Sequence, residues 1–354
     1  MPNVKIDSEA LKAFLTSVFA KTGMPQADAE FAAWSTVQSD LWGIDSHGTL
    51  RTPDYEKRLR DKVVNPAPKI VNKLNPALPI GHIDGDAGLG YIVGRDGMLL
   101  AIEKAKTFGV SLIIASNSNH YGAAGIYARM AAAEGLLGLT VTNVKPNIGM
   151  PGVTAPVSGN NPIALAAPIP DSDPFCIDVA MSMVALGKLI YAKKKGVSIP
   201  TGWATDRAGN DTTDPDEGIK GILLPTGMHK GFGISLFIDI LTGLLGGGPF
   251  LSQMISMYSH PDKPSNLAHA FIAINIDMFM ERSEYNKRIL EWRDILHNTP
   301  VRAGLPPLII PGEPEIESEK ERRANGITLP AQLWADLQAI AKVHGLPVPA
   351  VAEA

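Results

Sequence analysis

The chain has 354 residues, of which 45% are hydrophobic and 19% charged, so it can bury an ample core and is not an intrinsically disordered protein. Its net charge of −4, with Lys193–Lys195 as the one basic run, argues against nucleic-acid binding. A single cysteine, Cys176, excludes an intramolecular disulfide, and no uninterrupted apolar stretch reaches the about 18 residues of a membrane span. Charged residues where a signal peptide would need an apolar run predict a cytoplasmic protein.

The first sixty residues predict helices. Apolar residues at helical spacing follow Asp7-Ser8 and stop at Gly23, and a second helix is expected from Gln26 to Trp42. A third begins at Thr52-Pro53, where threonine suits the N-cap and proline the first turn. The segment Asp45–Arg51 between them is too polar for a core and too compact for a linker.

Beyond a proline-rich connection, short apolar β-rich runs alternate with helical stretches, which predicts an α/β body. Strands are expected at Ser111–Ala115, Leu137–Val144, Pro162–Ala167, Phe175–Val179, Ile222–Leu224 and Ala270–Ile276. Helices are expected at Gly94–Phe108, Gly122–Glu134, Met181–Lys195 and Lys230–Leu245. The tail returns to helix at Glu281–His297 and Pro330–His344, joined through the Pro/Gly/Glu-rich stretch Pro306–Pro314. Helices from the two chain ends are expected to pack together as one discontinuous domain.

The pattern G-x-G-x-x-x-G at Gly88–Gly94, which precedes a helix, resembles a dinucleotide-binding fingerprint. A Rossmann site also needs a buried strand just before the glycines and an acid or an arginine after the next strand. Residues 79–85 make a poor central strand, and the strand at Ser111–Ala115 ends in Ser116-Asn117. We therefore expect these glycines not to form a Rossmann site.

Ser46-His47-Gly48-x-x-Arg51 is the first candidate for chemistry. Histidine exchanges a proton near neutral pH, and arginine holds a carboxylate through two parallel hydrogen bonds. If the segment begins a helix, His47 and Arg51 share a face because they lie four residues apart. The structural alternative is a helix cap at Ser46 followed by two solvated polar side chains.

The second candidate is Asn119-His120-Tyr121-Gly122, which follows a predicted strand, the place where catalytic groups of α/β proteins gather. A turn capped by His120 is the alternative. The eight histidines include no H-E-x-x-H pattern and no Cys/His cluster, so no metal site is expected. Cys176 inside a strand predicts a buried structural thiol, and the absence of a G-x-S-x-G elbow argues against a serine hydrolase.

Two glycine-rich segments complete the candidates. Gly227–Gly233 opens a predicted helix whose N–H groups, together with the charge of Lys230, suit a phosphate. Pro311–Pro314 is a turn that can equally well connect two elements.

Together these segments resemble the malate/L-lactate dehydrogenase family of non-Rossmann NAD(P)-dependent oxidoreductases. That family includes ureidoglycolate dehydrogenases, 2,3-diketogulonate reductases, sulfolactate dehydrogenases and piperideine-2-carboxylate reductases. The similarity runs over almost the whole chain and also involves Gly159-Asn160-Asn161-Pro162, Asp178-Val179-Ala180-Met181-Ser182, Thr213-Asp214-Pro215 and Asn325-Gly326-Ile327. Each motif alone is weak, and their number and order carry the assignment.

The resemblance implies a mixed-sheet α/β body at residues 76–280, with a non-Rossmann nicotinamide-binding lobe at about 118–250. A helical domain built from residues 1–75 and 281–354 would flank this body, and the protein would be a homodimer. NAD or NADP would be the cofactor and a small anionic molecule the substrate, with no nucleic-acid or membrane partner.

The resemblance also implies residue roles. His120 and His47 are the candidates for proton transfer, with His120 favoured, and Ser46 and Arg51 would bind the substrate carboxylate. The cofactor would contact Asp178, Val179, Ala180, Met181, Ser182, Met183, His229, Lys230, Gly312, Glu313 and Pro314. Lys145 would favour a second anionic group on the substrate if it faces the pocket, and would have no role if it faces solvent.

The expected reaction is hydride transfer between a small 2-hydroxy acid and its 2-oxo acid, with a histidine as acid and base and an arginine that orients C2. Reduction of a cyclic imine, such as piperideine- or pyrroline-2-carboxylate, is the alternative that uses the same carboxylate clamp. A catalytically silent nucleotide-binding or scaffold protein is a third possibility, against which the presence of His47, Arg51, His120 and Lys230 argues. The sequence does not choose between NAD and NADP.

Overall fold

The computed structural model describes residues 2–353, and a mixed seven-stranded sheet of order β2-β3-β4-β10-β5-β6-β7 lies at its centre. The strands are Val71–Asn72 (β2), Ile80–Asp84 (β3), Val110–Ser118 (β4), Leu136–Thr142 (β5), Ile163–Ala167 (β6), Phe175–Val179 (β7) and Leu267–Asn275 (β10). β3 and β4 are parallel, whereas β10 runs antiparallel to β4 and β5, and β6 runs antiparallel to β5 and β7. Consequently β3, β4, β5 and β7 all end at the same edge of the sheet.

Helices cover both faces of this sheet. α4 (Gly90–Phe108) and α5 (Gly125–Ala133) lie on one face, where they share a core with Ile113 of β4. α8 (His229–Asp239) lies on the other face and packs near Ile114, because adjacent residues of a strand point to opposite sides. The expected mixed α/β body is therefore confirmed.

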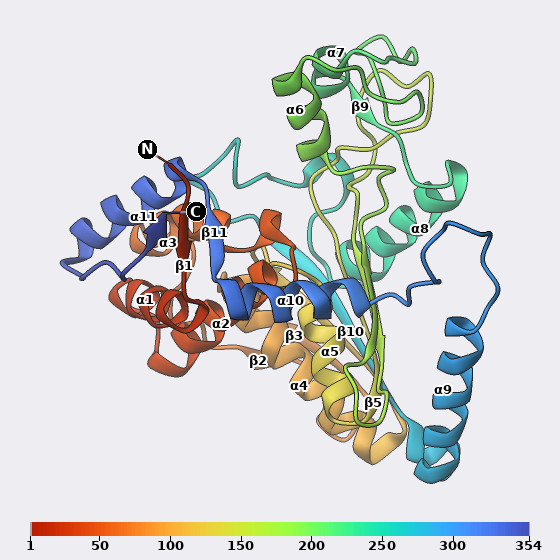
Figure 1. Ribbon diagram of the computed structural model, residues 1–354. Coiled ribbons are helices and arrows are strands. Elements are labelled where there is room, and N and C mark those ends of the chain that lie inside the picture. The colour runs from red at the N-terminus through yellow and green to blue at the C-terminus, as the bar shows by residue number, and fades with distance from the viewer. Residues whose placement is uncertain (1, 354) are drawn as a thin grey trace.

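Segments from the two chain ends pack together beside the sheet. The N-terminal part supplies β1 (Val4–Ile6), α1 (Ser8–Lys21), α2 (Gln26–Leu41) and α3 (Thr52–Arg60), and the C-terminal part supplies α10 (Glu313–Asn325), β11 (Ile327–Leu329), α11 (Ala331–His344) and β12 (Ala352–Glu353). β1 lies between β11 and β12 in a small antiparallel sheet, and the two ends of the chain lie close together (Figure 1).

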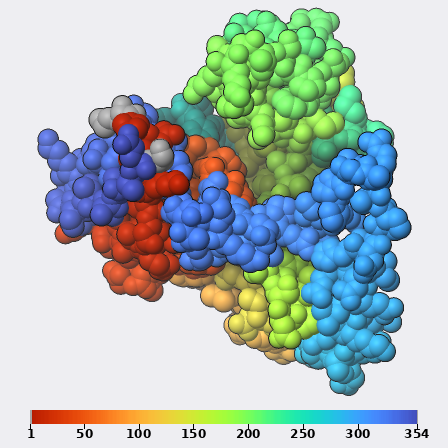
Figure 2. Space-filling model, in the orientation of Figure 1, coloured from red at the N-terminus to blue at the C-terminus, as the bar shows by residue number. Residues whose placement is uncertain are grey.

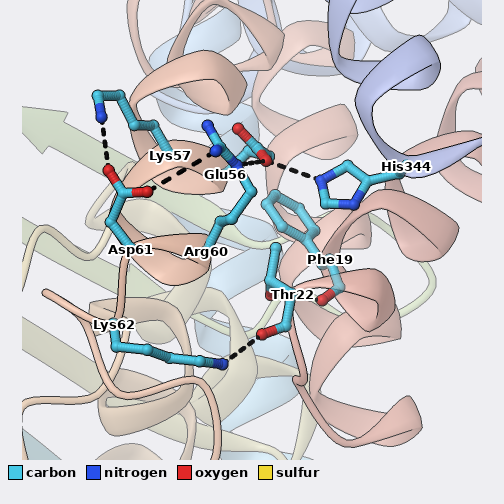
Figure 3. A network of polar contacts seen from close by, with 8 residues as sticks. All are labelled: Phe19, Thr22, Glu56, Lys57, Arg60, Asp61, Lys62 and His344. Carbon is cyan, nitrogen blue, oxygen red and sulfur yellow. Dashed lines mark hydrogen bonds and ion pairs between the residues drawn. The ribbon is translucent and has the colours of Figure 1, made fainter.

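A polar network ties three of these helices together (Figure 3). Glu56 of α3 is buried, and its carboxylate accepts a hydrogen bond from Arg60 and lies 2.7 Å from Nε2 of His344 in α11. Lys62, just after α3, donates to the carbonyl oxygen of Thr22 at the end of α1. The bond between Glu56 and His344 holds α11 against α3, and the bond from Lys62 holds the end of α3 against α1.

Two parts of the chain stand out from this body. α6 (Leu186–Lys195), α7 (Pro215–Lys220), β8 (Ala204–Thr205) and β9 (Ile222–Leu223) form a small lobe with its own apolar core. Figure 2 shows a hollow between this lobe and the helices of the chain ends. α9 (Arg282–His297) lies on the outside of the body (Figure 1), where Trp292 packs edge-on against Phe175 of β7, and none of its described residues is buried. No helix within residues 2–353 is long and apolar enough to cross a membrane.

Several predicted elements differ from the observed ones. Glu313–Asn325 forms helix α10, which the sequence analysis did not predict because the segment lacks an apolar stripe. Residues 181–183, predicted to begin a helix, are not helical, because their backbone hydrogen-bonds with residues 224–226. Residues 79–85, judged a poor central strand, do contain a strand, Ile80–Asp84, but it lies next to the edge strand β2. The strands β1 and β11 were also missed.

Candidate active site

Candidate residues from three strands gather at one edge of the sheet. His120 lies two residues after β4, Lys145 lies three residues after β5, and Asp178 is next to the last residue of β7. Because these strands are mutually parallel, residues far apart in the sequence leave the sheet at a common edge, where ligands of α/β proteins bind. Lys145 is exposed there.

The two histidines singled out from the sequence meet in the structure. Their rings stack with centroids 5.5 Å apart and planes inclined by 19°. His47 lies in a short 3-10 turn, Asp45–His47, rather than in an α-helix, and its Nδ1 is 2.9 Å from the hydroxyl of Ser46. His47 and His120 are therefore positioned for action on one ligand.

A buried carboxylate shapes the segment that carries His47. Asp40 of α2 accepts hydrogen bonds from the backbone N–H of Thr49 at 2.9 Å and from its hydroxyl. A Cβ at Gly48 would lie 1.8 Å from Oδ1 of Asp40, so only glycine fits there. Burial raises the pKa of Asp40 to about 7. The sequence analysis missed Asp40, which lies inside a predicted helix without any motif.

Arg51 lies near both histidines, since its charge acts on His47 and His120. Its Nε donates to the carbonyl oxygen of Ser46 at 2.6 Å, its guanidinium lies over the ring of Tyr258 with 5.3 Å to the centroid, and Asp54 is 3.9 Å away. The bond from Nε orients the guanidinium, and the contact with Asp54 is made by Nη1 at a long 3.9 Å. Arginine binds a carboxylate through its terminal nitrogens, so Arg51 can serve as a carboxylate clamp.

Both histidines are neutral at pH 7. Burial, and then the charge of Arg51, lower the pKa of His47 to about 4. Burial lowers the pKa of His120 well below its ordinary value, with further contributions from His47 and Arg51. Each ring can therefore accept a proton from a ligand without first losing one.

A third histidine near this edge has a structural role. His269 of β10 is buried, with its Nδ1 2.7 Å from the hydroxyl of Thr142 and its Nε2 2.8 Å from that of Ser118. It stacks on Tyr121, with ring centroids 4.5 Å apart, and burial lowers its pKa to about 3. Both ring nitrogens are engaged, so His269 braces the segment that carries His120.

The segments expected to hold a cofactor are partly brought together. The N–H of Met183 donates to the carbonyl of Leu224, and the N–H of Thr226 donates to that of Met181. This pairing places residues 181–183 just ahead of the first turn of α8, where His229 and Lys230 are exposed. The N–H groups of Lys230 and Gly231 already donate to the carbonyls of Gly227 and Thr226, so it is the exposed ammonium group of Lys230 that fits a phosphate.

The second part of the expected cofactor site lies along β7. Asp178 accepts a hydrogen bond from the N–H of Gly125 at 2.7 Å, and burial raises its pKa to about 6. The N–H of Cys176 donates to the carbonyl of Pro311, and a Cβ at Gly312 would lie 3.0 Å from the carbonyl oxygen of Pro174. The turn at 311–314 therefore packs against β7.

The other residues expected to bind the cofactor differ in exposure and in hydrogen bonding. Val179 and Met183 are exposed, whereas Met181 and Ser182 are buried. Both carboxylate oxygens of Glu313 are engaged: Oε2 accepts from the N–H of Ile310, and Oε1 lies 2.7 Å from Nε2 of His297 at the end of α9. Cys176 is buried, as expected, and burial raises the pKa of its thiol to about 11.

The glycines at 88–94 allow the start of α4 to pack closely against neighbouring residues. A Cβ at Gly90 would lie 2.2 Å from the carbonyl oxygen of Asn119, and one at Gly94 would lie 2.5 Å from the ring of Tyr127. The start of α4 is thus pressed against the chain beside His120, with no room for a pyrophosphate between them. The resemblance to a dinucleotide fingerprint is misleading, as expected.

Comparison with known proteins gives a consistent result. The profile of the family described as malate/L-lactate dehydrogenase matches residues 6–338. The malate dehydrogenase of Pyrococcus horikoshii is 39% identical over 352 residues, which cover 97% of this chain and 96% of that protein. The L-sulfolactate dehydrogenase of Methanocaldococcus jannaschii is 36% identical over 338 residues, with 95% and 96% covered.

Solved structures agree with the sequence matches. The sulfolactate dehydrogenase from Methanocaldococcus jannaschii superposes with a TM-score of 0.91 at 35% identity and covers 98% of both chains. With the match to the family profile over residues 6–338, these similarities show that the chain belongs to the malate/L-lactate dehydrogenase family and is a dehydrogenase.

Proposed function

We propose that the chain interconverts a small 2-oxo acid and its 2-hydroxy acid with NAD or NADP as the hydride carrier. The observation that carries this proposal is the convergence of Arg51, His47 and His120 at one site. An arginine next to two neutral imidazoles provides a carboxylate clamp and a proton acceptor. The malate and sulfolactate dehydrogenases to which the chain is similar support the same class of substrate.

The residues of this chain bind, orient and exchange a proton. Arg51, assisted by Ser46, holds the substrate carboxylate, which fixes the orientation of C2. The nicotinamide supplies or accepts the hydride when it is bound. His120 takes the hydroxyl proton during oxidation and returns it to the carbonyl oxygen during reduction, while His47 stacks against its ring.

The cofactor would be held by residues 178–183, by His229 and Lys230 at the start of α8, and by Gly312, Glu313 and Pro314. Support comes from the pairing of residues 181–183 with the strand that leads to α8, and from the close packing of Gly312 against β7. We also propose a homodimer, which would cover exposed apolar side chains such as Ile295 of α9, 63% exposed.

The test is a coenzyme-oxidation assay of the purified protein with NADH and NADPH against oxaloacetate, pyruvate, oxalurate, diketogulonate, sulfopyruvate and piperideine-2-carboxylate. We expect turnover with at least one 2-oxo acid and one preferred coenzyme. Turnover of the imine alone would replace the 2-oxo acid proposal by imine reduction. Nucleotide binding without any turnover would favour a silent binding protein.

A further inference from the structure

The phenol of Tyr55 forms a hydrogen bond with His120 at the candidate site. Tyr55 lies on α3 and is 2% exposed, and its hydroxyl is 2.6 Å from Nδ1 of His120. The backbone N–H of Gly122 also points to Nδ1, over a longer 3.4 Å. One ring nitrogen of His120 is therefore engaged by the protein, which leaves Nε2 for a ligand.

The surroundings hold Tyr55 rigidly. Tyr91 packs edge-on against its ring, with centroids 5.7 Å apart, and Tyr91 donates to the carbonyl oxygen of His47 at 3.2 Å. Burial raises the pKa of Tyr55 well above its ordinary value, so the side chain stays a phenol. Tyr55 therefore acts through hydrogen bonding and not through loss of its own proton.

We propose that Tyr55 is a positioning residue that holds His120 through Nδ1 in both protonation states, so that Nε2 alone exchanges the proton with the substrate. Because Nε2 gains and loses the proton, Nδ1 carries its hydrogen in both states, and the phenol oxygen accepts from it each time. A phenylalanine cannot accept this bond. This inference rests on the proposed 2-oxo acid chemistry.

The proton balance fits this assignment. In reduction the hydride adds to C2, the C=O π bond opens, and the proton on Nε2 moves to the oxygen, which leaves a neutral ring with Nδ1–H bonded to Tyr55. In oxidation the same atoms act in reverse. The titratable and charged groups that face His120 are His47, Arg51, Tyr55, Arg58 and His269. The positive charges of Arg51 and Arg58 disfavour its protonated form, so an acceptor at Nδ1 matters.

Tyr55→Phe tests the proposal, and Tyr127→Phe is the matched control. Tyr127 is equally buried, and its hydroxyl donates to the carbonyl of Tyr121. We expect kcat/KM for reduction to fall at least about tenfold in Tyr55→Phe at pH 7, because the protonated ring loses a charged hydrogen bond. The acid limb of kcat/KM for oxidation should move by about one pH unit to lower pH, with KM for the coenzyme unchanged. Rates and pH profiles like those of Tyr127→Phe would overturn the proposal.

Nitrogen NMR of the histidine rings tests Tyr55 even without turnover. The His120 signals are assigned by their absence in His120→Gln. The wild-type protein should show Nδ1 of His120 in a strong hydrogen bond that Tyr55→Phe removes and Tyr127→Phe keeps. A wild-type Nδ1 without that bond would contradict the inference, even if Tyr55→Phe did not fold. If the spectra match these expectations but the protein turns over no 2-oxo acid, the proposed reaction is wrong. The inference that Tyr55 positions His120 would still hold.

Discussion

At the residue scale, His47 and His120 are neutral at pH 7 because burial and the charge of Arg51 depress their pKa values. Oxidation uses the neutral ring as a base, whereas reduction needs the minor protonated form. We therefore expect kcat/KM for oxidation to stay level between pH 7 and 9, and kcat/KM for reduction to fall about tenfold per pH unit. Initial rates in both directions check this, and a level reduction profile would show that the proton comes from another group.

Lys145 carries a prediction about substrate choice. It is exposed just beyond β5, at the edge where His120 also lies, and it could contact a second anionic group on the substrate. If it does, Lys145→Ala should raise KM for the dianion oxaloacetate about tenfold and leave KM for the monoanion pyruvate unchanged. Equal changes for both acids would place Lys145 outside the pocket.

The sequence identified His47, Arg51 and His120 because each lies in a polar motif outside a regular element. It could not identify Asp40 or Tyr55. Asp40 acts through Thr49, nine residues away, and Tyr55 acts on His120, which is 65 residues away. Such contacts depend on how helices pack on the sheet, and a single sequence carries no signal of that packing.

At the element scale, the pair between Glu56 and His344 fastens α11 to α3 (Figure 3). The two side chains are only 4% and 8% exposed, so loss of one partner leaves a buried carboxylate short of a hydrogen bond. We expect His344→Ala to lower the free energy of unfolding by about 2 kcal/mol, measured by urea denaturation.

Lys57→Ala is the control for that measurement. Lys57 pairs with Asp61 on the same helix as Glu56, but its side chain is 60% exposed. Exposed pairs of this kind contribute little to stability, because water and salt screen them. If both variants lose the same small amount, the buried pair does not fasten α11.

Elements with a clear apolar period were predicted well, and those held by long-range polar bonds were not. α1 and α2 follow their apolar spacing, and the strand at Phe175–Val179 was predicted with its observed bounds. α10 is highly charged and is held to α2 by bonds such as those from Gln38 and Trp42 to Glu319. β1 and β11 have three residues each and pair with each other, and β1 also pairs with β12. Neither segment contains a local sequence pattern that predicts this pairing.

At the scale of the whole molecule, α9 lies at the side of the body (Figure 1), where Trp292 packs edge-on against Phe175 and apolar side chains such as Ile295 stay exposed. A helix in water normally buries an apolar face, so the homodimer proposal gives the exposed side of α9 a partner surface. We expect the wild-type protein to sediment as a dimer and Ile295→Asp to shift it toward the monomer. Val343→Asp on α11 is the control, because Val343 is 61% exposed and Ile295 is 63% exposed. If Ile295→Asp stays as dimeric as this control, α9 lies outside the interface.

The measurement that tests the central claim most directly follows the hydride itself. Reduced coenzyme that carries deuterium at both C4 positions of the nicotinamide is incubated with the wild-type protein and each 2-oxo acid, and the products are analysed by mass spectrometry. Hydride transfer predicts one deuterium at C2 of a 2-hydroxy acid product, with formation at least about 100-fold slower in His120→Gln. No labelled product with any 2-oxo acid, from protein that binds the coenzyme, would contradict the proposed reaction.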